Sequence, residues 1–272
     1  MKKPRRAHSV GDQFDGGISV PPQIDPDQGS TLDLVCILDC IGDPAIIQAR
    51  VALLRDIVDT VGTGYSAPGG VRLGVVGYAD TLHVEAVQPS SGLPPPLQVY
   101  PLAAPETVLD RLTGLATLTH REQDYPGLLE EALDALLRPP PGQRAVGWRP
   151  GSARAVLFLG DRPPHPSEVG AHRFVRSPRG LVWEERLTTA RKELRARAVA
   201  VRWPTSETWP RPLLETEASY AEQCWRTLGA DGLFGASAAA LDEIALALDP
   251  SYGQQVVSLP LPIVAGGVVT LV

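Results

Sequence analysis

Aspartates that directly follow the most apolar segments are the residues best placed to do chemistry. Asp39 ends an apolar run over residues 32–38, and Asp43 follows the short turn after it. Asp161 comes just after a second apolar run, residues 153–159. Such runs are typical of parallel strands buried on both faces. Ligands of open α/β sheets bind outside the carboxyl ends of the strands, so we expect these carboxylates to converge there.

A divalent cation is the ligand that converging carboxylates favour. Asp124, at the start of a predicted helix, completes the set of predicted metal ligands, which are Asp39, Asp43, Asp124 and Asp161. Unpaired carboxylates at one edge repel one another, and a hard cation with oxygen ligands relieves that repulsion. We expect Mg²⁺, with Mn²⁺ or Ca²⁺ as alternatives.

Two of these aspartates have a simpler role open to them. Asp43 stands before Pro44 and Asp124 shortly before Pro126, and aspartate near a helix start is what N-capping alone selects. Capping and ligation are compatible for Asp43, because each uses a different carboxylate oxygen. Asp39 and Asp161 end strands too apolar to hold a charge without a partner, which favours a site role for them.

The polar segment after Asp161 carries the predicted partner-binding residues. They are Arg162, His165, His172 and Arg173, which suit an acidic partner. The alternative is that this segment is a solvated loop. Cys40 lies beside Asp39, whose charge would raise the pKa of the thiol, and no histidine is near it in sequence, so a thiol nucleophile is disfavoured.

The elements that would position these residues alternate between strand and helix. Predicted strands cover residues 32–38, 71–78, 81–87, 153–159, 196–203 and 232–234. Predicted helices begin at Asp43-Pro44 and cover residues 106–118, 124–137, 183–195, 219–228 and 237–248, with a proline-rich loop at 89–105. In the first helix the apolar positions are Ile47, Val51, Leu54, Val58 and Val61. This order predicts one doubly wound, mostly parallel sheet with one antiparallel edge strand and helices on both faces.

Composition narrows the classes of function and compartment. The net charge of −6 over 272 residues gives no basic field for nucleic acid or anionic lipid. Three cysteines, an odd number, fit a reducing cytoplasm, and no apolar run is long enough to cross a bilayer. We expect a flexible tail at 1–30, one domain at 31–250, and a C-terminal strand extension or the start of a further segment at 251–272.

Several segments together resemble a known family. Residues 33–43 resemble the first strand and Asp-x-Ser-x-Ser turn of von Willebrand factor A domains, and residues 71–80 look like their second strand. Residues 123–127, followed by Ala132-Leu133, are similar to the loop and helix that carry the family's threonine ligand. Residues 155–165 resemble the strand and distal aspartate of many bacterial members.

The resemblance implies a metal-ion-dependent adhesion site, whose cation is completed by a partner's carboxylate. Asp39 and Asp161 match the family pattern, whereas Ile41 and Asp43 replace its serines and Asp124 is the nearest match to its threonine. Ile41 cannot ligate, and each added carboxylate lowers the effective charge of the cation. We therefore expect either a metal ion that depends less on a partner's carboxylate, or a degenerate site without metal. In both cases the same surface is still used for recognition.

The function expected from these observations is protein binding rather than catalysis. We expect a cytoplasmic interaction module within a multi-component bacterial system, binding another protein and neither nucleic acid nor membrane. Dinucleotide, phosphate-loop, zinc-protease and serine-hydrolase motifs are all missing from the sequence. The alternative is a metal-dependent hydrolase, a nuclease or phosphohydrolase, that uses the same aspartates with bound cations.

Overall fold

One mixed sheet organises the chain. The computed structural model describes residues 31–65, 69–79, 97–113, 125–205, 211–249 and 251. Within them the strands are β1 (Leu32–Asp39), β2 (Val71–Tyr78), β3 (Leu97–Ala103), β4 (Ala153–Gly160), β5 (Arg197–Arg202) and β6 (Gly232–Gly235). They form a six-stranded sheet in the order β3-β2-β1-β4-β5-β6, in which only the edge strand β3 is antiparallel to its neighbour. The predicted fold class is confirmed.

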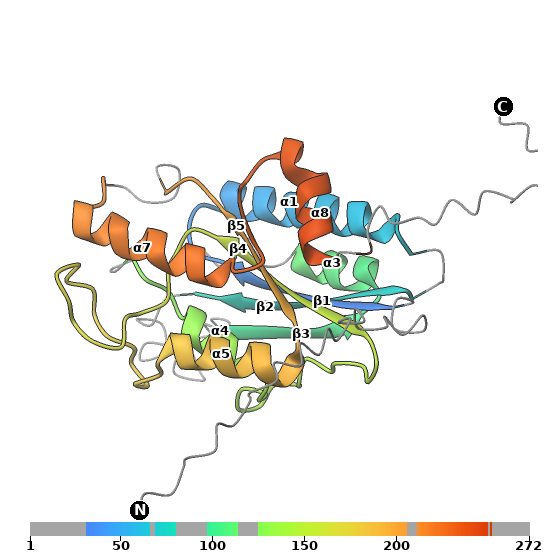
Figure 1. The fold of residues 1–272 in the computed structure, drawn as a ribbon, viewed down its shortest axis with the longest axis horizontal. Coiled ribbons are helices and arrows are strands. Elements are labelled where there is room, and N and C mark those ends of the chain that lie inside the picture. The colour runs from blue at the N-terminus through green and yellow to red at the C-terminus, as the bar shows by residue number, and fades with distance from the viewer. Residues whose placement is uncertain are drawn as a thin grey trace, which may run out of the picture.

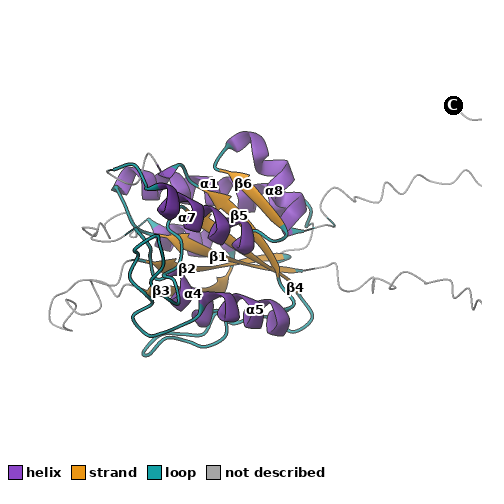
Figure 2. Cartoon of the chain, turned by 60° about the vertical axis from the view of Figure 1, so that its left-hand side comes forward, coloured by secondary structure: helices purple, strands orange, loops and turns teal. Residues whose placement is uncertain are grey.

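Helices cover both faces of this sheet (Figure 1). The described helices are α1 (Pro44–Gly62), α3 (Pro105–Leu112), α4 (Leu129–Ala135), α5 (Trp183–Leu194), α7 (Glu215–Leu228) and α8 (Leu241–Leu248), with a short 3₁₀ turn η2 (Ala238–Ala240). The core cluster on one face contains residues of α1, α3 and α8, and that on the other face contains residues of α4, α5 and α7. Figure 2 shows α1 and α8 above the sheet, with α4 and α5 below it.

Helix α1 follows from its sequence. The Asp43 side chain accepts a hydrogen bond from the Ala45 amide at 2.8 Å, and Pro44 occupies the first helical position, where no amide hydrogen is needed. The buried face comprises Ile47, Arg50, Leu53, Leu54, Ile57, Val58 and Val61. Arg50 is the exception in this apolar stripe, and it points towards the carboxyl edge of the sheet, as the contacts below show.

The structure corrects several predicted boundaries. The loop predicted at 89–105 is wrong for residues 97–103, which form β3, and the strand predicted at 81–87 lies outside the described residues. Pro101 is tolerated in β3 because an edge strand needs only one side of its backbone for pairing. Helix α4 begins only at Leu129, since Gly127 instead forms a β-bridge with Pro164.

The other differences at helix ends are small. Helix α7 begins at Glu215, before the predicted residue 219, and the last predicted helix is divided into η2 and α8. Within the part of the chain that the structure describes, no helix combines the length and apolar character needed to cross a membrane.

Candidate functional site

Asp39 and Asp161 lie together where the winding of the sheet reverses. From β1 the chain proceeds to β2 on one side and later returns to β4 on the other, so β1 and β4 are adjacent parallel strands. Asp39 is the last residue of β1, and Asp161 directly follows β4. Crevices of open α/β sheets form at this kind of reversal. The predicted convergence of these two residues is therefore observed.

Backbone amides hold the Asp39 carboxylate in place. Its Oδ1 accepts a hydrogen bond from the Ile41 amide at 2.9 Å. Its Oδ2 accepts from the amides of Asp161 and Arg162, both at 3.2 Å. The Asp39 side chain therefore ties the turn after β1 to the turn after β4.

Arg50 supplies the positive charge between the two aspartates. Its Nη2 donates to Asp161 Oδ1 at 2.6 Å, and its Nη1 lies 3.3 Å from Asp39 Oδ2. The same Nη1 donates to the carbonyl oxygens of Asp39 at 2.7 Å and Ile41 at 3.1 Å. All three charged side chains are completely buried. A buried guanidinium is tolerated here because its charge is matched and both of its Nη atoms donate hydrogen bonds.

The electrostatics favour a permanently charged Arg50. Burial by itself lowers the pKa of this guanidinium, but the neighbouring carboxylates of Asp39 and Asp161 outweigh burial and raise the pKa above its ordinary value. Arg50 also lies over the ring of Trp203, with 5.9 Å between the guanidinium carbon and the ring centroid. The group is thus a fixed internal cation.

Gly160 is required where β4 passes β1. A Cβ built on Gly160 would lie 2.2 Å from the Cβ of Asp39, and the glycine has a φ of +158°. No side chain fits in this space without displacing Asp39. The glycine before Asp161 therefore lets the two strand ends approach closely enough to share Arg50.

Aromatic donors fix the backbone of Asp161. Its carbonyl oxygen accepts hydrogen bonds from the Tyr125 hydroxyl at 2.9 Å and from Trp225 Nε1 at 3.0 Å. The Tyr78 hydroxyl donates to the Arg162 carbonyl at 2.9 Å. Burial first, and then the Asp39 charge, raise the pKa of Tyr78, so this phenol stays protonated as a donor. These contacts join β2, α7 and the segment before α4 to the site.

Asp43, a further predicted ligand, does not join this arrangement. Asp43 is exposed and caps α1 through the Ala45 amide. Ile41, in the place of the family's first serine, is completely buried. Asp124 lies outside the described residues.

The described residues do not fit a divalent cation in this arrangement. Mg²⁺ requires near-octahedral oxygen ligands, and the oxygens of Asp39 and Asp161 that would supply them face Arg50, Arg162 or backbone amides. Among the described residues, no group of three or more histidine, cysteine, aspartate or glutamate side chains is arranged to hold a metal ion. Sequence reasoning missed Arg50, whose one visible signal was an arginine on an otherwise apolar helix face.

Arg162 and His165 were expected to contact a partner, but both side chains are buried. The Arg162 guanidinium donates to the Tyr125 carbonyl at 3.1 Å, lies 5.1 Å from that ring's centroid, and approaches Asp161 Oδ2 at 3.9 Å. His165 Nδ1 lies 3.1 Å from Glu130 Oε1, and its amide donates to Glu130 Oε2 at 3.1 Å. These two residues therefore support the segment after β4 from inside the molecule.

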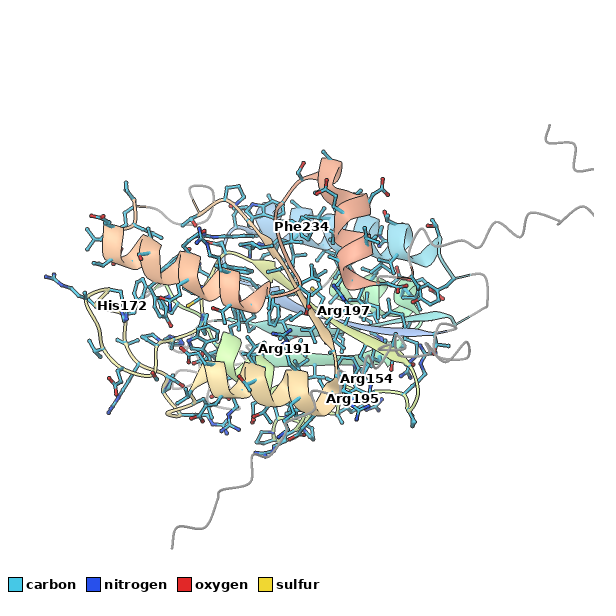
Figure 3. The ribbon with its side chains drawn as sticks, in the orientation of Figure 1. Arg154, His172, Arg191, Arg195, Arg197 and Phe234 are labelled. Carbon is cyan, nitrogen blue, oxygen red and sulfur yellow. The ribbon has the colours of Figure 1, made fainter. Side chains whose placement is uncertain are left out.

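His172 and Arg173 lie further along the same segment. His172 is half-buried, and its ring lies 4.6 Å from Tyr220 and 5.3 Å from Phe174, centroid to centroid. Arg173 is exposed and has a left-handed backbone with φ of 61°. Figure 3 shows His172 beside α7, on the other side of the view from Arg154 and Arg195. Only Arg173 of the predicted partner-binding set is fully at the surface.

The cysteines do not form a reactive site. Cys36, Cys40 and Cys224 are all buried and free of disulfides. Burial, followed by the charge of Asp39, raises the pKa of Cys40 to about 12. The thiolate needed for nucleophilic chemistry is therefore strongly disfavoured at neutral pH.

Comparisons with solved structures give similar folds at low identity. The von Willebrand factor domain of the type V pilus tip protein Mfa5 from Porphyromonas gingivalis is 11% identical, with a TM-score of 0.45, covering 83% of this chain and 95% of that chain. The pilus adhesin SpaC from Lactobacillus rhamnosus GG, in its open conformation, is 11% identical with a TM-score of 0.48, covering 83% of this chain and 30% of SpaC. Proximal thread matrix protein 1 from the mussel byssus is 13% identical with a TM-score of 0.44, covering 82% and 48%.

The chain thus spans less than half of the mussel protein and of SpaC. No protein-family model matches the sequence, and no curated protein matches it.

Proposed function

We propose that this chain is a protein-binding module of the von Willebrand factor A type, which docks an acidic partner at the carboxyl edge of the sheet. The observation that carries the proposal is the segment between β4 and α5, residues 161–182, here called the β4–α5 loop. It is held from inside by buried side chains, and yet it presents apolar side chains to solvent. The resemblance of the sequence to that family supports the same assignment.

Of the five exposed large apolar residues in the part of the chain that the structure describes, three lie in this loop or near it. Val169 is 66% exposed and Val175 is 53% exposed, and both belong to the loop. Leu214, which is 52% exposed, precedes α7. The Thr216 hydroxyl in α7 donates to the Ala171 carbonyl at 3.2 Å, so the start of α7 lies against the loop. Figure 1 shows the loop and α7 at the same end of the molecule.

The loop has a fixed conformation in spite of its length. Phe174 is buried, with ring centroids 5.9 Å from Tyr125 and 5.8 Å from Tyr220. The Ser177 hydroxyl oxygen accepts from the Leu181 amide at 3.1 Å, and the Ser177 amide donates to the Pro166 carbonyl at 3.1 Å. A surface that is already ordered loses less conformational entropy on binding, which favours recognition.

The charge of the exposed loop residues supports an acidic partner. Arg173 and Arg176 are exposed beside Val175, while Glu168 is exposed beside Val169. Arginine with apolar neighbours is typical of the centres of protein interfaces. We therefore commit to a protein segment that carries carboxylates next to an apolar side chain.

The alternative, a metal-dependent hydrolase, has less support. It requires the oxygens of Asp39 and Asp161 to coordinate cations that activate water. Those oxygens face Arg50, Arg162 and backbone amides in a buried position. The arrangement also leaves the aspartates out of reach of a substrate at the surface.

Site-specific photo-crosslinking tests the proposal. A photoreactive residue is placed at Val175 or, as a matched control, at Leu246 on α8, because the two positions are 53% and 52% exposed. We expect one defined adduct from Val175 in extracts of the source cells, and none from Leu246. Arg173→Glu should remove the Val175 adduct.

The partner recovered in this way is then purified and titrated. Val175→Asp should weaken its binding by about tenfold or more, as expected for an apolar contact in an interface core. Leu246→Asp should leave binding unchanged. Equal adducts from both positions, or equal loss of affinity in both variants, would refute the docking surface.

A further inference from the structure

We propose that the guanidinium of Arg50 takes the place of the divalent cation at the carboxyl edge, so that the site is complete without a metal ion. Oxygens of three residues face Arg50. They come from the turn after β1, at Asp39 and Ile41, and from Asp161 after β4. The family resemblance implies a metal at these two segments and at the loop of Asp124, which lies outside the described residues.

Short contacts hold the Arg50 guanidinium at both strand ends. Nη2 contacts Asp161 Oδ1 at 2.6 Å, and Nη1 contacts the Asp39 carbonyl at 2.7 Å. One guanidinium thus bridges the Asp161 carboxylate, which follows β4, and the Asp39 backbone, at the end of β1. A planar cation with several fixed donors performs this bridging better than the flexible ammonium of lysine.

Charge balance gives a second, independent argument. The carboxylates of Asp39 and Asp161 face Arg50, and the Nε of Arg162 lies 3.9 Å from Asp161 Oδ2. All of these side chains are completely buried. A doubly charged ion added here would lie against two guanidinium groups in a poorly screened interior, where like charges repel strongly.

The fold also keeps Arg50 from leaving. It sits in the buried stripe of α1, three residues after Ile47, and its guanidinium lies 5.9 Å from the centroid of the Trp203 ring. Ile41 is buried beside it and has no polar side-chain atom to offer a metal. Moving Arg50 aside would leave two buried carboxylates and no ligand in place of the first serine.

One consequence rests on the proposed function. A metal in a site of this type keeps a coordination position for a carboxylate of the partner, whereas a buried guanidinium whose Nη atoms are already bonded does not. An acidic partner would then be recognised by the exposed arginines of the β4–α5 loop, and its binding would not change on adding a chelator.

The inference is tested on the full chain with Mn²⁺, whose unpaired electrons broaden nearby proton signals. Trp225 Nε1 donates to the Asp161 carbonyl at 3.0 Å, so its indole N–H reports on the site. We expect this signal, assigned with Trp225→Phe, to be unaffected by Mn²⁺ in the wild-type protein. Selective broadening of the signal would overturn the inference. Broadening of other indole signals alone would place Mn²⁺ elsewhere and support it.

Variants of Arg50 make the converse test. Arg50→Ser removes the internal cation and opens space among the same oxygens, so Mn²⁺ should raise its unfolding temperature and broaden the Trp225 signal. Arg50→Lys keeps the charge, so Mn²⁺ should change neither its unfolding temperature nor its Trp225 signal. If Arg50→Ser folds and Mn²⁺ changes neither its unfolding temperature nor its Trp225 signal, the inference is overturned. The oxygens around Arg50 would then not form a site for a divalent cation.

The wild-type measurement decides the matter even if Arg50→Ser does not fold. No partner takes part in these experiments. Failure of the docking surface would therefore leave this inference standing, and its own failure would leave the docking surface standing.

Discussion

The Arg50 guanidinium donates to the Asp161 carboxylate across 2.6 Å, although the residues are 111 positions apart in sequence and both are completely buried. This single contact joins α1 to the turn after β4. Together with the contact to Asp39, it closes the place where the winding of the sheet reverses. The stability of the domain should depend on it.

Arg50→Met therefore should destabilise the protein by about 3–5 kcal/mol, since breaking a buried ion pair leaves an uncompensated charge. Methionine keeps much of the side-chain length without the positive charge. Arg55→Met, at an exposed position of the same helix, should change stability by roughly 0.5 kcal/mol or less. Urea unfolding at neutral pH measures both, and equal effects would show that the buried pair contributes nothing.

A charge-neutral background sharpens this prediction. Adding Asp39→Asn and Asp161→Asn to Arg50→Met should recover part of the lost free energy of unfolding, because no buried charge is then left unmatched. Additive losses from all the substitutions would argue against a shared electrostatic cause.

Gly160→Ala should destabilise the protein by steric overlap at the carboxyl ends of β1 and β4. The added Cβ would lie 2.2 Å from the Cβ of Asp39, so β1 and β4 would have to separate at their carboxyl ends. We expect a loss of about 1–3 kcal/mol, the usual range for overpacking. Gly62→Ala is the control, because nothing lies within 4 Å of its added Cβ. Thermal unfolding of the two variants should differ clearly, and matching midpoints would contradict the close approach.

A buried aspartate at the amino-terminal end of β1 should make the stability of the protein depend on pH. Asp33 is buried and accepts hydrogen bonds from Arg72 and Arg149. Burial raises the pKa of Asp33, but the bonds from these arginines outweigh burial, so the folded pKa lies below its ordinary value. A depressed folded pKa contributes stability above the unfolded pKa, and that stability is lost as the pH falls through the folded value.

Asp33→Asn should accordingly cost free energy of unfolding at pH 7, and the gap to wild type should narrow below about pH 4, near the pKa of an unfolded aspartate. Urea titrations at several pH values measure this gap. A gap of constant size from neutral to acidic pH would mean that the Asp33 charge is not what stabilises the strand.

Phe174 anchors the β4–α5 loop, and Phe174→Ala should release it. The ring is buried against Tyr125 and Tyr220, and its loss should expose the chain after Arg173 and Arg176 to trypsin. Val175→Ala changes an exposed neighbour and should leave the cleavage rate as it is in wild type. Equal cleavage of wild type and Phe174→Ala would show that the ring does not hold the loop.

The central strands could be predicted from sequence because burial on both faces leaves an unbroken apolar run. This holds for β1, β2 and β4, and the aspartates after β1 and β4 follow from the same logic. The edge strand β3 could not be predicted, because Pro101 and the prolines before it are typical of a loop, and only pairing with β2 shows that an edge strand accepts them.

The candidate site could be predicted only in part. Asp39 and Asp161 are local to strand ends, whereas the role of Arg50 depends on a partner that arrives after a long crossover. Helical spacing places Arg50 on the buried face of α1, which indicates a buried charge but not what neutralises it. Likewise, burial of Arg162 and His165 depends on Tyr125 and Glu130 from a distant segment.

The most direct test is a crystal structure of the full chain grown with Mn²⁺, using anomalous scattering to locate the ion. We predict the Arg50 guanidinium between Asp39 and Asp161, with no anomalous peak within bonding distance of either carboxylate. A Mn²⁺ peak bonded to those carboxylates, with Arg50 displaced, would contradict the account.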